Sequence, residues 1–484
     1  MARPRKVSDP TTFPEACGRC GQHYQVAARW PDGPVCGYCY QRAKRTRGTC
    51  ACGHIGVLPG IVDEQPACRG CSGVRLNVDC RACGAEDELY DGGRCWTCVL
   101  AASVDRLLTN PATGTVSPEL LPMATALKSM ERANSGLTWI RQPHVTAFLQ
   151  HLAVAHAITH EALDQLPASR TRDYVRGLLV EHGALPRRDE LLARFTVWSG
   201  QALERLPAGE HRDVVDRFVR WHLVRRMNAA PGAVTQGTFL RSKQTTTVTI
   251  DFLTWLSARG TTLSRLTQAD LDAWQAGGPT TRELASRFLA WAIKAHLVDP
   301  DLRMQPHRRG TADKLPATEQ AAAVQAVVHH DDLTARDRLA AILVLVLGQQ
   351  VEDVVRLTWD DATVTDDLAT ITLGEAPVDL PPPLDEPLRQ LLADPGHGRT
   401  AAHPHSPWIF RGHSPGRHLS AAHLRQRLKT VCSTRAARLG TLADLARTSP
   451  IPVLAEILGY HQTTLERHAV AAANTYGRYI ATRR

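Results

Sequence analysis

Six close pairs of cysteines lie in the first hundred residues, and thiols at this spacing can bind a metal ion. Taken in order they form three sets of four, with 15, 15 and 11 residues between the two pairs of a set. Each pair can reach one ion from a tight turn, and a second pair completes a tetrahedron. Because four thiolates leave no position open for water, the pattern predicts about three structural zinc ions in zinc-ribbon-like modules. The twelve predicted ligands are Cys17, Cys20, Cys36, Cys39, Cys50, Cys52, Cys68, Cys71, Cys80, Cys83, Cys95 and Cys98.

Two features of the cysteine region leave alternatives open. A disulfide framework would need an oxidising compartment, and the amino terminus MARPRKVSDP has no apolar export segment, so we favour metal. The Cys50-Ala-Cys52 pair has one intervening residue instead of two, so His54 could replace one of its ligands. Pairing of the six turns in an interleaved order also remains open.

Composition favours a soluble cytoplasmic protein with an anionic partner. The chain has 484 residues, is 43% hydrophobic and carries a formal charge of +9. Its longest apolar run, Leu339–Leu347, is too short to span a bilayer. Three zinc–thiolate centres would lower the charge to about +3. The segment from His405 to Arg484 nevertheless has eleven Arg and one Lys against three acidic residues, which indicates binding to a polyanion.

Hydrophobic periodicity predicts a mainly α fold with a small β-sheet insertion. We expect a zinc-binding region over residues 1–100, a helical domain over 118–230, a second compact helical domain over 232–305 and a carboxyl-terminal domain over 318–484. The segment from Asn228 to Gly237 has the composition of a linker.

Three short segments of the carboxyl-terminal domain have strand character. Leu368–Leu373 is the best strand, and APVDLPPPL after it reads as an edge strand ended by prolines. Trp408–Phe410 is a third candidate. The remaining segments are helical in pattern, and VLAEILGYHQTTLERHA also fits a helix-turn-helix, with Thr463 or Thr464 capping the second helix.

Several motifs between residues 232 and 484 resemble tyrosine recombinases of the phage-integrase type. FLTWL, DLDAW and RFLAWA resemble the core-binding domain of that family. LVLGQQVEDVVRLTWDD resembles the opening of its catalytic domain, and ILGYHQTTLERHA resembles the closing segment. The chain most resembles a group of actinobacterial recombinase-like proteins that have a cysteine region at the amino terminus.

The resemblance implies a set of catalytic residues that this chain has only in part. In the family a tyrosine attacks a DNA phosphodiester, two arginines hold the phosphate oxygens, a lysine acts as acid and a histidine as base. Here Gln350 stands at the first arginine position and Glu375 in the turn that usually holds the lysine. Arg435 is the best match for the second arginine, with Arg438 as a shifted option, and Cys432 replaces the histidine before Arg435.

The closing motif departs from the family as well. Tyr460 occupies the usual histidine position, His461 follows it, and His468 falls at the position of the nucleophile. Tyr476 and Tyr479 lie further on and could serve only if the last helix is displaced. We therefore expect a degenerate active site.

These observations predict a double-stranded DNA-binding protein that lacks strand-cleavage activity, is cytoplasmic and is associated with the nucleoid. The alternatives are an active recombinase with a rearranged site, a helix-turn-helix transcriptional regulator, and a scaffold whose zinc modules bind a protein partner. The residues expected to contact DNA are Arg425, Arg427, Lys429, Arg435, Arg438 and Arg467.

Overall fold

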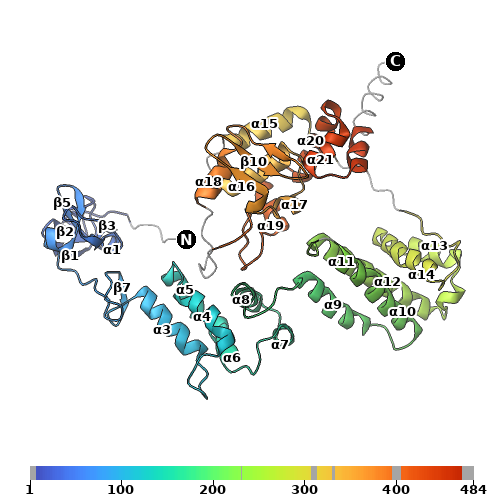
Figure 1. The fold of residues 1–484 in the computed structure, drawn as a ribbon, viewed down its shortest axis with the longest axis horizontal. Helices are drawn as coiled ribbons and strands as arrows, with labels where there is room; N and C mark the ends of the chain where they lie inside the picture. Colours follow the sequence, from blue (N-terminus) through green and yellow to red (C-terminus); the bar gives the residue numbers. More distant parts are fainter. Residues whose placement is uncertain (1–6, 231, 307–312, 330–332, 395–404, 471–484) are drawn as a thin grey trace. The chain divides into compact units, whose positions relative to one another are not determined.

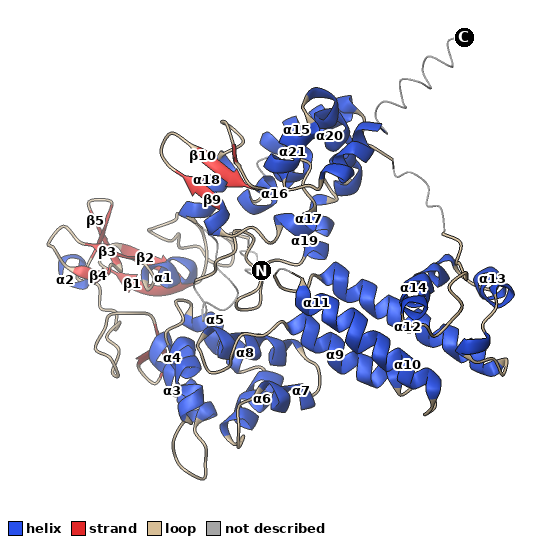
Figure 2. Ribbon diagram, turned by 45° about the vertical axis from the view of Figure 1, so that its right-hand side comes forward, coloured by secondary structure: helices blue, strands red, loops and turns tan. Residues whose placement is uncertain are grey.

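The computed structural model describes residues 7–230, 232–306, 313–329, 333–394 and 405–470 (Figure 1). The chain divides into two compact units, one built from Met1–Leu185 with Asp313–Arg484 and the other from Pro186–Ala312. The structure is mainly helical with small antiparallel sheets, which confirms the predicted fold class (Figure 2). Every helix of the described ranges is too short or too polar to span a lipid bilayer.

The cysteine region repeats one local design three times, in which a β-hairpin leads into a helix. The third cysteine of each tetrad precedes the first residue of that helix, with an extended backbone. Such an N-cap conformation is typical of helix starts. The elements are β1 (Val26–Trp30), β2 (Gly33–Cys36), α1 (Gly37–Ala43), β3 (Arg47–Thr49), β4 (Ile55–Val57), β5 (Gly60–Val62), β6 (Gln65–Ala67), α2 (Arg69–Ser72), β7 (Leu89–Asp91), β8 (Arg94–Cys95) and α3 (Trp96–Leu108).

Helix α3 runs from the last cysteine module into a helical region that ends at Leu185. Its apolar face, including Leu100 and Val104, is buried in one core with the helices that follow. Tyr90 stacks on Trp96, with ring centroids 3.7 Å apart, and accepts a 2.6 Å hydrogen bond from Arg141. The remaining helices are α4 (Leu121–Lys128), α5 (Ala133–Ile140), α6 (Pro143–Ala153), α7 (His160–Gln165) and α8 (Arg170–Glu181).

The second unit is a bundle around one core that extends from Phe195 to Leu302. This core contains helices on both sides of the segment 228–237, the predicted linker. Thr267 and Asp270 form a capping box, and Trp274 is buried in the core. The elements are α9 (Glu190–Leu203), α10 (Glu210–Phe218), the π-helical turn η2 (Val219–Val224), α11 (Arg225–Ala229), α12 (Gln236–Ala258), α13 (Gln268–Ala276), η4 (Thr280–Ala285) and α14 (Ser286–Lys294).

The carboxyl-terminal region packs helices around a three-stranded antiparallel sheet of order β11-β10-β9. The best predicted strand is β10, and the following segment is the edge strand β11, as predicted. The third prediction was wrong: Trp408 makes only an isolated bridge to Thr358 and forms no strand. The elements are α15 (Ala317–Val328), α16 (Ala335–Leu345), α17 (Val351–Val354), β9 (Ala362–Val364), β10 (Ala369–Thr372), β11 (Pro377–Asp379), α18 (Glu386–Ala393), α19 (Ala421–Leu428), α20 (Thr434–Thr448) and α21 (Ile451–Leu458).

Two buried amides hold the helices of this region in register. The amide of Gln320 donates to the carbonyl oxygen of Leu345 at 2.7 Å and to the hydroxyl of Thr441 at 2.5 Å, so it joins α15, α16 and α20. Gln349 donates at 3.1 Å to the carbonyl oxygen of Leu458, at the end of α21. Since a buried polar group without a partner is costly, these bonds fix the loop after α16 against α20 and α21.

Candidate functional site

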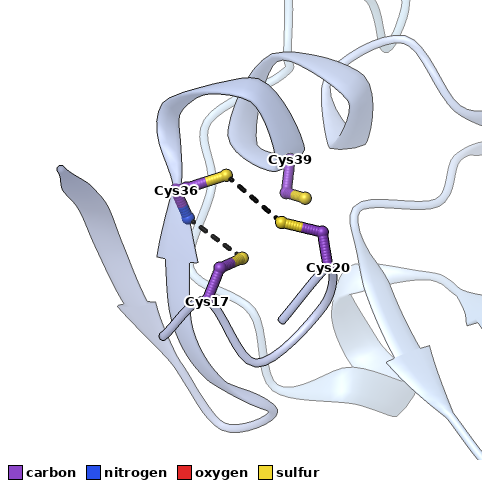
Figure 3. A group of neighbouring side chains, drawn as sticks. All are labelled: Cys17, Cys20, Cys36 and Cys39. Atoms are coloured by element: carbon purple, nitrogen blue, oxygen red, sulfur yellow. Dashed lines mark hydrogen bonds between the residues drawn. The ribbon is translucent and has the colours of Figure 1, made fainter. Parts of the chain in front are cut away.

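The twelve amino-terminal thiols converge in three separate tetrads. In each tetrad all four Sγ atoms lie within 4.8 Å of one another, and the sets are the consecutive ones. Figure 3 shows the first tetrad, in which the Sγ atoms of Cys20 and Cys36 are 3.8 Å apart. A tetrahedral zinc ion with four Zn–S bonds of about 2.3 Å requires about 3.8 Å between sulfurs. A disulfide would need about 2.05 Å, so the thiols are placed for a metal ion.

The short Cys50-Ala-Cys52 pair fits the same geometry because a glycine closes its turn. In the first and third tetrads the N–H of Gly21 and of Gly84 donates to the carbonyl of the first cysteine, four residues earlier. Gly53 makes the equivalent bond over three residues, and its φ is +87°. This left-handed backbone suits glycine, so the missing residue does not displace the second thiol.

Backbone donors stabilise one thiolate in each tetrad. The N–H of Cys36, Cys68 and Cys95 donates to the first sulfur of its own set at 3.3, 3.3 and 3.2 Å. Backbone N–H groups lower the pKa of Cys50 to about 6, whereas the neighbouring thiols, Cys52 foremost, raise the pKa of Cys71 to about 12. The Cys71 thiol therefore ionises readily only beside a cation, such as a Zn²⁺ ion bound by the four sulfurs.

His54 lies outside the second tetrad and contacts Glu86 instead. The Nε2 atom of His54 is 3.0 Å from a carboxylate oxygen of Glu86, which also accepts from the N–H of Val57 at 3.0 Å. Arg69 donates to the other oxygen at 2.6 Å. Partial burial opposes ionisation of Glu86, yet these donors, Arg69 first, lower its pKa. Glu86 thus joins the second module to the third.

In the carboxyl-terminal region, Arg438 and Tyr460 lie together at the end of the loop that follows α16. Arg438 Nη1 donates to the Tyr460 hydroxyl at 3.4 Å, and that hydroxyl donates to the carbonyl oxygen of Gly348 at 2.7 Å. Burial raises the pKa of Tyr460, and Arg438 opposes the rise. Of the two candidate arginines, Arg438 is therefore the one beside the closing motif, whereas Arg435 is exposed on α20.

His468 is half-buried among cations in the same area. Burial lowers its pKa most, and the charges of Arg438, Lys314 and Arg467 lower it further. The chain around Lys314 runs along α20, because the N–H of Leu315 donates to the carbonyl of Ala436 at 3.0 Å. The imidazole is therefore neutral near pH 7 in a cationic setting, where it is suited to contact an anion.

Two further positions that the sequence resemblance matches to catalytic cations carry no positive charge. Gln350 is exposed at the start of α17. Glu375 is exposed on the turn after β10, and its N–H donates to the carbonyl of Glu456 on α21 at 2.8 Å. A Cβ on Gly374 would lie 2.0 Å from that same carbonyl oxygen, so only glycine allows this turn to approach α21. The turn is thus held near the closing motif but presents a carboxylate.

The end of α21 is followed by a turn and a further helix, with one difference from the prediction. Gly459 has φ +70°, and residues 462–470 form the next helix. The cap of this helix is His461, whose Nδ1 accepts from the N–H of Thr463 at 3.3 Å. The prediction that Thr463 or Thr464 caps it was wrong, because the helix begins before both. His461 is thus engaged in a local structural contact.

The predicted DNA-contacting residues differ in whether their side chains already have partners within the protein. Arg425 pairs with Glu352, and Arg427 donates at 2.6 Å to Asp337, a buried carboxylate of α16. Arg467 donates to the carbonyl of Thr463 at 3.1 Å. Lys429 and Arg435 are exposed, and neither has a hydrogen bond or ion pair among the described residues. Arg427 therefore has a structural role, and Arg435 and Lys429 are the cations better placed to contact a phosphate.

Sequence reasoning missed Lys314, Asp353 and Gln349. Asp353, in the VEDVV segment, follows the first arginine position by three residues; desolvation raises its pKa, and Arg356 and Arg438 oppose the rise. The only hint at Gln349 in the sequence was that two glutamines stand side by side. In the structure Gln349 is buried and Gln350 is exposed. No sequence signal marked Lys314, because it lies more than a hundred residues from its neighbours. Tyr476 and Tyr479 lie outside the described residues.

Comparison with known proteins gave structural similarities at low identity. No family model matches the chain, and no curated protein matches it. The chain is similar to XerH site-specific recombinase bound to palindromic difH substrate, at 14% identity and TM-score 0.39, over 58% of this chain and 93% of that one. It is also similar to a lambda integrase dimer bound to a COC' core site, at 16% identity and TM-score 0.34, over 52% of this chain and 96% of that one. A third similar structure is the Tn1549 transposon integrase in complex with transposon right end DNA, at 12% identity and TM-score 0.28, over 60% of this chain and 98% of that one.

Proposed function

We propose that the chain is a double-stranded DNA-binding protein on a tyrosine-recombinase-like scaffold that binds DNA without cutting it. The observation that carries this proposal is the contact of Arg438 with Tyr460, whose hydroxyl is already committed to the carbonyl of Gly348. Where the family resemblance calls for a histidine, this chain has a phenol that is tied to its own backbone. A phosphate at this place would meet one guanidinium.

Cleavage needs more positive charge than these positions supply. In-line attack on a phosphodiester develops charge on the phosphate oxygens, and preorganised cations must stabilise it. Gln350 contributes no charge, and Glu375, on a turn held against α21, contributes charge of the wrong sign. Loss of one such donor typically costs about 10²–10³-fold in rate. Two losses at one site would leave negligible cleavage.

Binding to phosphates needs less positive charge than cleavage does, and the chain retains the capacity for binding. Lys314, Arg438 and Arg467 all act on His468, so their charges lie close together. Arg435 and Lys429 are exposed on neighbouring segments. Phosphate contacts of this kind supply most of the affinity in sequence-independent binding. The loss of catalytic groups therefore does not remove the capacity to hold DNA.

The three thiol tetrads are proposed to hold structural zinc. Four sulfurs in each set, spaced for a tetrahedral ion, leave no position for a water or a substrate. These ions would fold the amino-terminal region, which has only small apolar clusters of its own. We propose that the folded modules add a DNA contact or a contact with a protein partner, in the cytoplasm at the nucleoid.

A nicked suicide duplex tests the proposal. We expect a complex on a native gel and no covalent protein–DNA adduct on a denaturing gel. A covalent adduct would overturn the proposal and support the rearranged recombinase, in which case Tyr476→Phe and Tyr479→Phe would identify the nucleophile. Absence of any complex at low salt would instead support the protein-interaction scaffold, because phosphate binding is strongest there.

A further inference from the structure

The second unit has a surface of unbalanced positive charge that the sequence patterns did not reveal. Residues 219–229, 236–250 and 286–294 contain no Asp and no Glu. They belong to η2 with α11, to the first part of α12, and to α14. Their cations are Arg220, which pairs with Asp216 at 2.8 Å, and Arg225, Arg226, Arg241, Lys243, Arg287 and Lys294.

Four of these cations lie close to His222 or to Arg287. Burial lowers the pKa of His222, and Arg226, Lys294 and Arg287 lower it further. Burial also lowers the pKa of Arg287, with contributions from Arg241 and Arg226. The four cationic side chains are exposed, and none has a hydrogen bond or ion pair among the described residues. Like charges collected without counter-ions favour an anionic partner.

An exposed indole lies in the same helical turn as His222. Trp221 is 67% exposed, and no other tryptophan of the described residues is exposed to this degree. It is adjacent to His222, whose ring stacks on Phe218 with centroids 5.3 Å apart. Both residues lie in η2, a π-helical turn, and such turns are frequent at functional sites. Arg217 and Arg225, four residues before and after Trp221, are exposed as well.

We propose that Trp221 and the cation cluster of Arg226, Arg241, Arg287 and Lys294 bind a nucleic-acid strand with unpaired bases. An exposed aromatic ring in a cationic setting is the combination that holds single strands, because bases stack on the ring while phosphates meet the cations. A paired duplex offers the indole no free base face, whereas an unpaired base does. This inference goes beyond the proposed function, since it concerns another surface and another form of nucleic acid.

The test compares two probes on the full-length zinc-loaded chain. We would measure binding of a labelled oligothymidylate of about 20 nucleotides and of a blunt duplex of the same length by fluorescence anisotropy. Trp221→Ala should weaken oligothymidylate binding about 10-fold or more, and Trp221→Phe should retain most of it, because stacking contributes about 1–3 kcal/mol per base. Val197→Ala, at a 50% exposed position of α9, is the matched control and should leave binding unchanged.

Charge reversal provides the second arm. The double variant Arg226→Glu with Lys294→Glu should abolish oligothymidylate binding, whereas Arg265→Glu, in a segment that also holds acidic residues, should have a small effect. The proposal is overturned if the wild type fails to bind the oligonucleotide. It is also overturned if Trp221→Ala weakens both probes equally, or if the surface binds phosphatidylglycerol vesicles in place of the oligonucleotide. Loss of duplex binding alone would count against the proposed function and leave this inference intact.

Discussion

The hydroxyl of Tyr460 donates a 2.7 Å hydrogen bond to the carbonyl oxygen of Gly348, although 112 residues separate the two in the chain. This bond joins the turn after α16 to the turn after α21, and Gln349 makes a parallel connection to Leu458. Tyr460 is therefore a structural link at a position where the family resemblance calls for a catalytic histidine.

Tyr460→Phe should destabilise the carboxyl-terminal region by about 1–3 kcal/mol, because a buried carbonyl loses its donor. Urea denaturation would measure this loss in the free energy of unfolding. Hydrogen exchange of the backbone amides around Gly348 should rise in the same variant. An unchanged free energy of unfolding would show that water replaces the phenol without cost.

Substitution of one cysteine in a tetrad should remove one metal ion. We expect metal analysis to give about three zinc equivalents for the wild type and about two for Cys20→Ser, because three thiolates bind a structural ion much less tightly than four. Cys432→Ser is the matched control, since Cys432 lies outside the tetrads, and it should retain about three. A value near zero for the wild-type chain, with oxidised thiols, would contradict the metal assignment.

Two arginines of the carboxyl-terminal region should respond differently to removal. Arg435→Ala should weaken duplex binding for every sequence and reduce the salt dependence by about one phosphate contact, with stability unchanged. Arg427→Ala should instead lower the free energy of unfolding by about 1.5–3 kcal/mol, because it removes the closest cation from the buried carboxylate of Asp337 and leaves only Arg336 at 3.5 Å. Binding titrations at several salt concentrations, together with denaturation, distinguish the two effects. Equal loss of stability in both variants would contradict the assignment.

His468 should make duplex binding depend on pH. Its pKa is lowered below the ordinary value of about 6.5 by burial and by Arg438, Lys314 and Arg467, so the free protein carries a neutral imidazole near neutral pH. A phosphate beside it would raise that pKa, and the complex would take up a proton. Affinity should therefore increase as pH falls from about 7.5 to about 6, and calorimetry in buffers of different ionisation enthalpy should detect the proton uptake.

His468→Gln should remove this part of the pH dependence, whereas His461→Gln is the matched control and should retain it. His461 is exposed and caps the helix of residues 462–470, so its ring is occupied locally. An affinity that falls with decreasing pH in the wild type would argue against a phosphate next to His468.

The sequence was informative where chemistry and spacing coincide. The spacing of Cys80, Cys83, Cys95 and Cys98 was sufficient to predict a tetrad, because two tight turns leave few ways to arrange four thiols. The capping box of Thr267 is equally local, because its partner Asp270 lies three residues away. Local geometry determined both features.

Contacts between distant segments could not be read in this way. Glu86 looked like one acid among several, yet it joins His54 and Arg69 across two modules. Arg427 looked like a free cation of a basic segment, but it pairs with a carboxylate 90 residues away. The charge cluster around His222 also combines three helices, each unremarkable by itself. Such sites depend on packing, which residue types alone do not specify.

Helix α3 connects the third cysteine tetrad to the helical region that ends at Leu185, which contains no tetrad. It begins directly after Cys95, carries Cys98 in its first turn, and reaches Leu108, about 20 Å further along. The first turn of this helix therefore belongs to the third tetrad, and the rest of the helix packs among the apolar side chains of the helical region. Chelation or thiol oxidation should loosen packing as far as Leu108, so protein prepared without reductant and zinc is expected to lose order well beyond its cysteines.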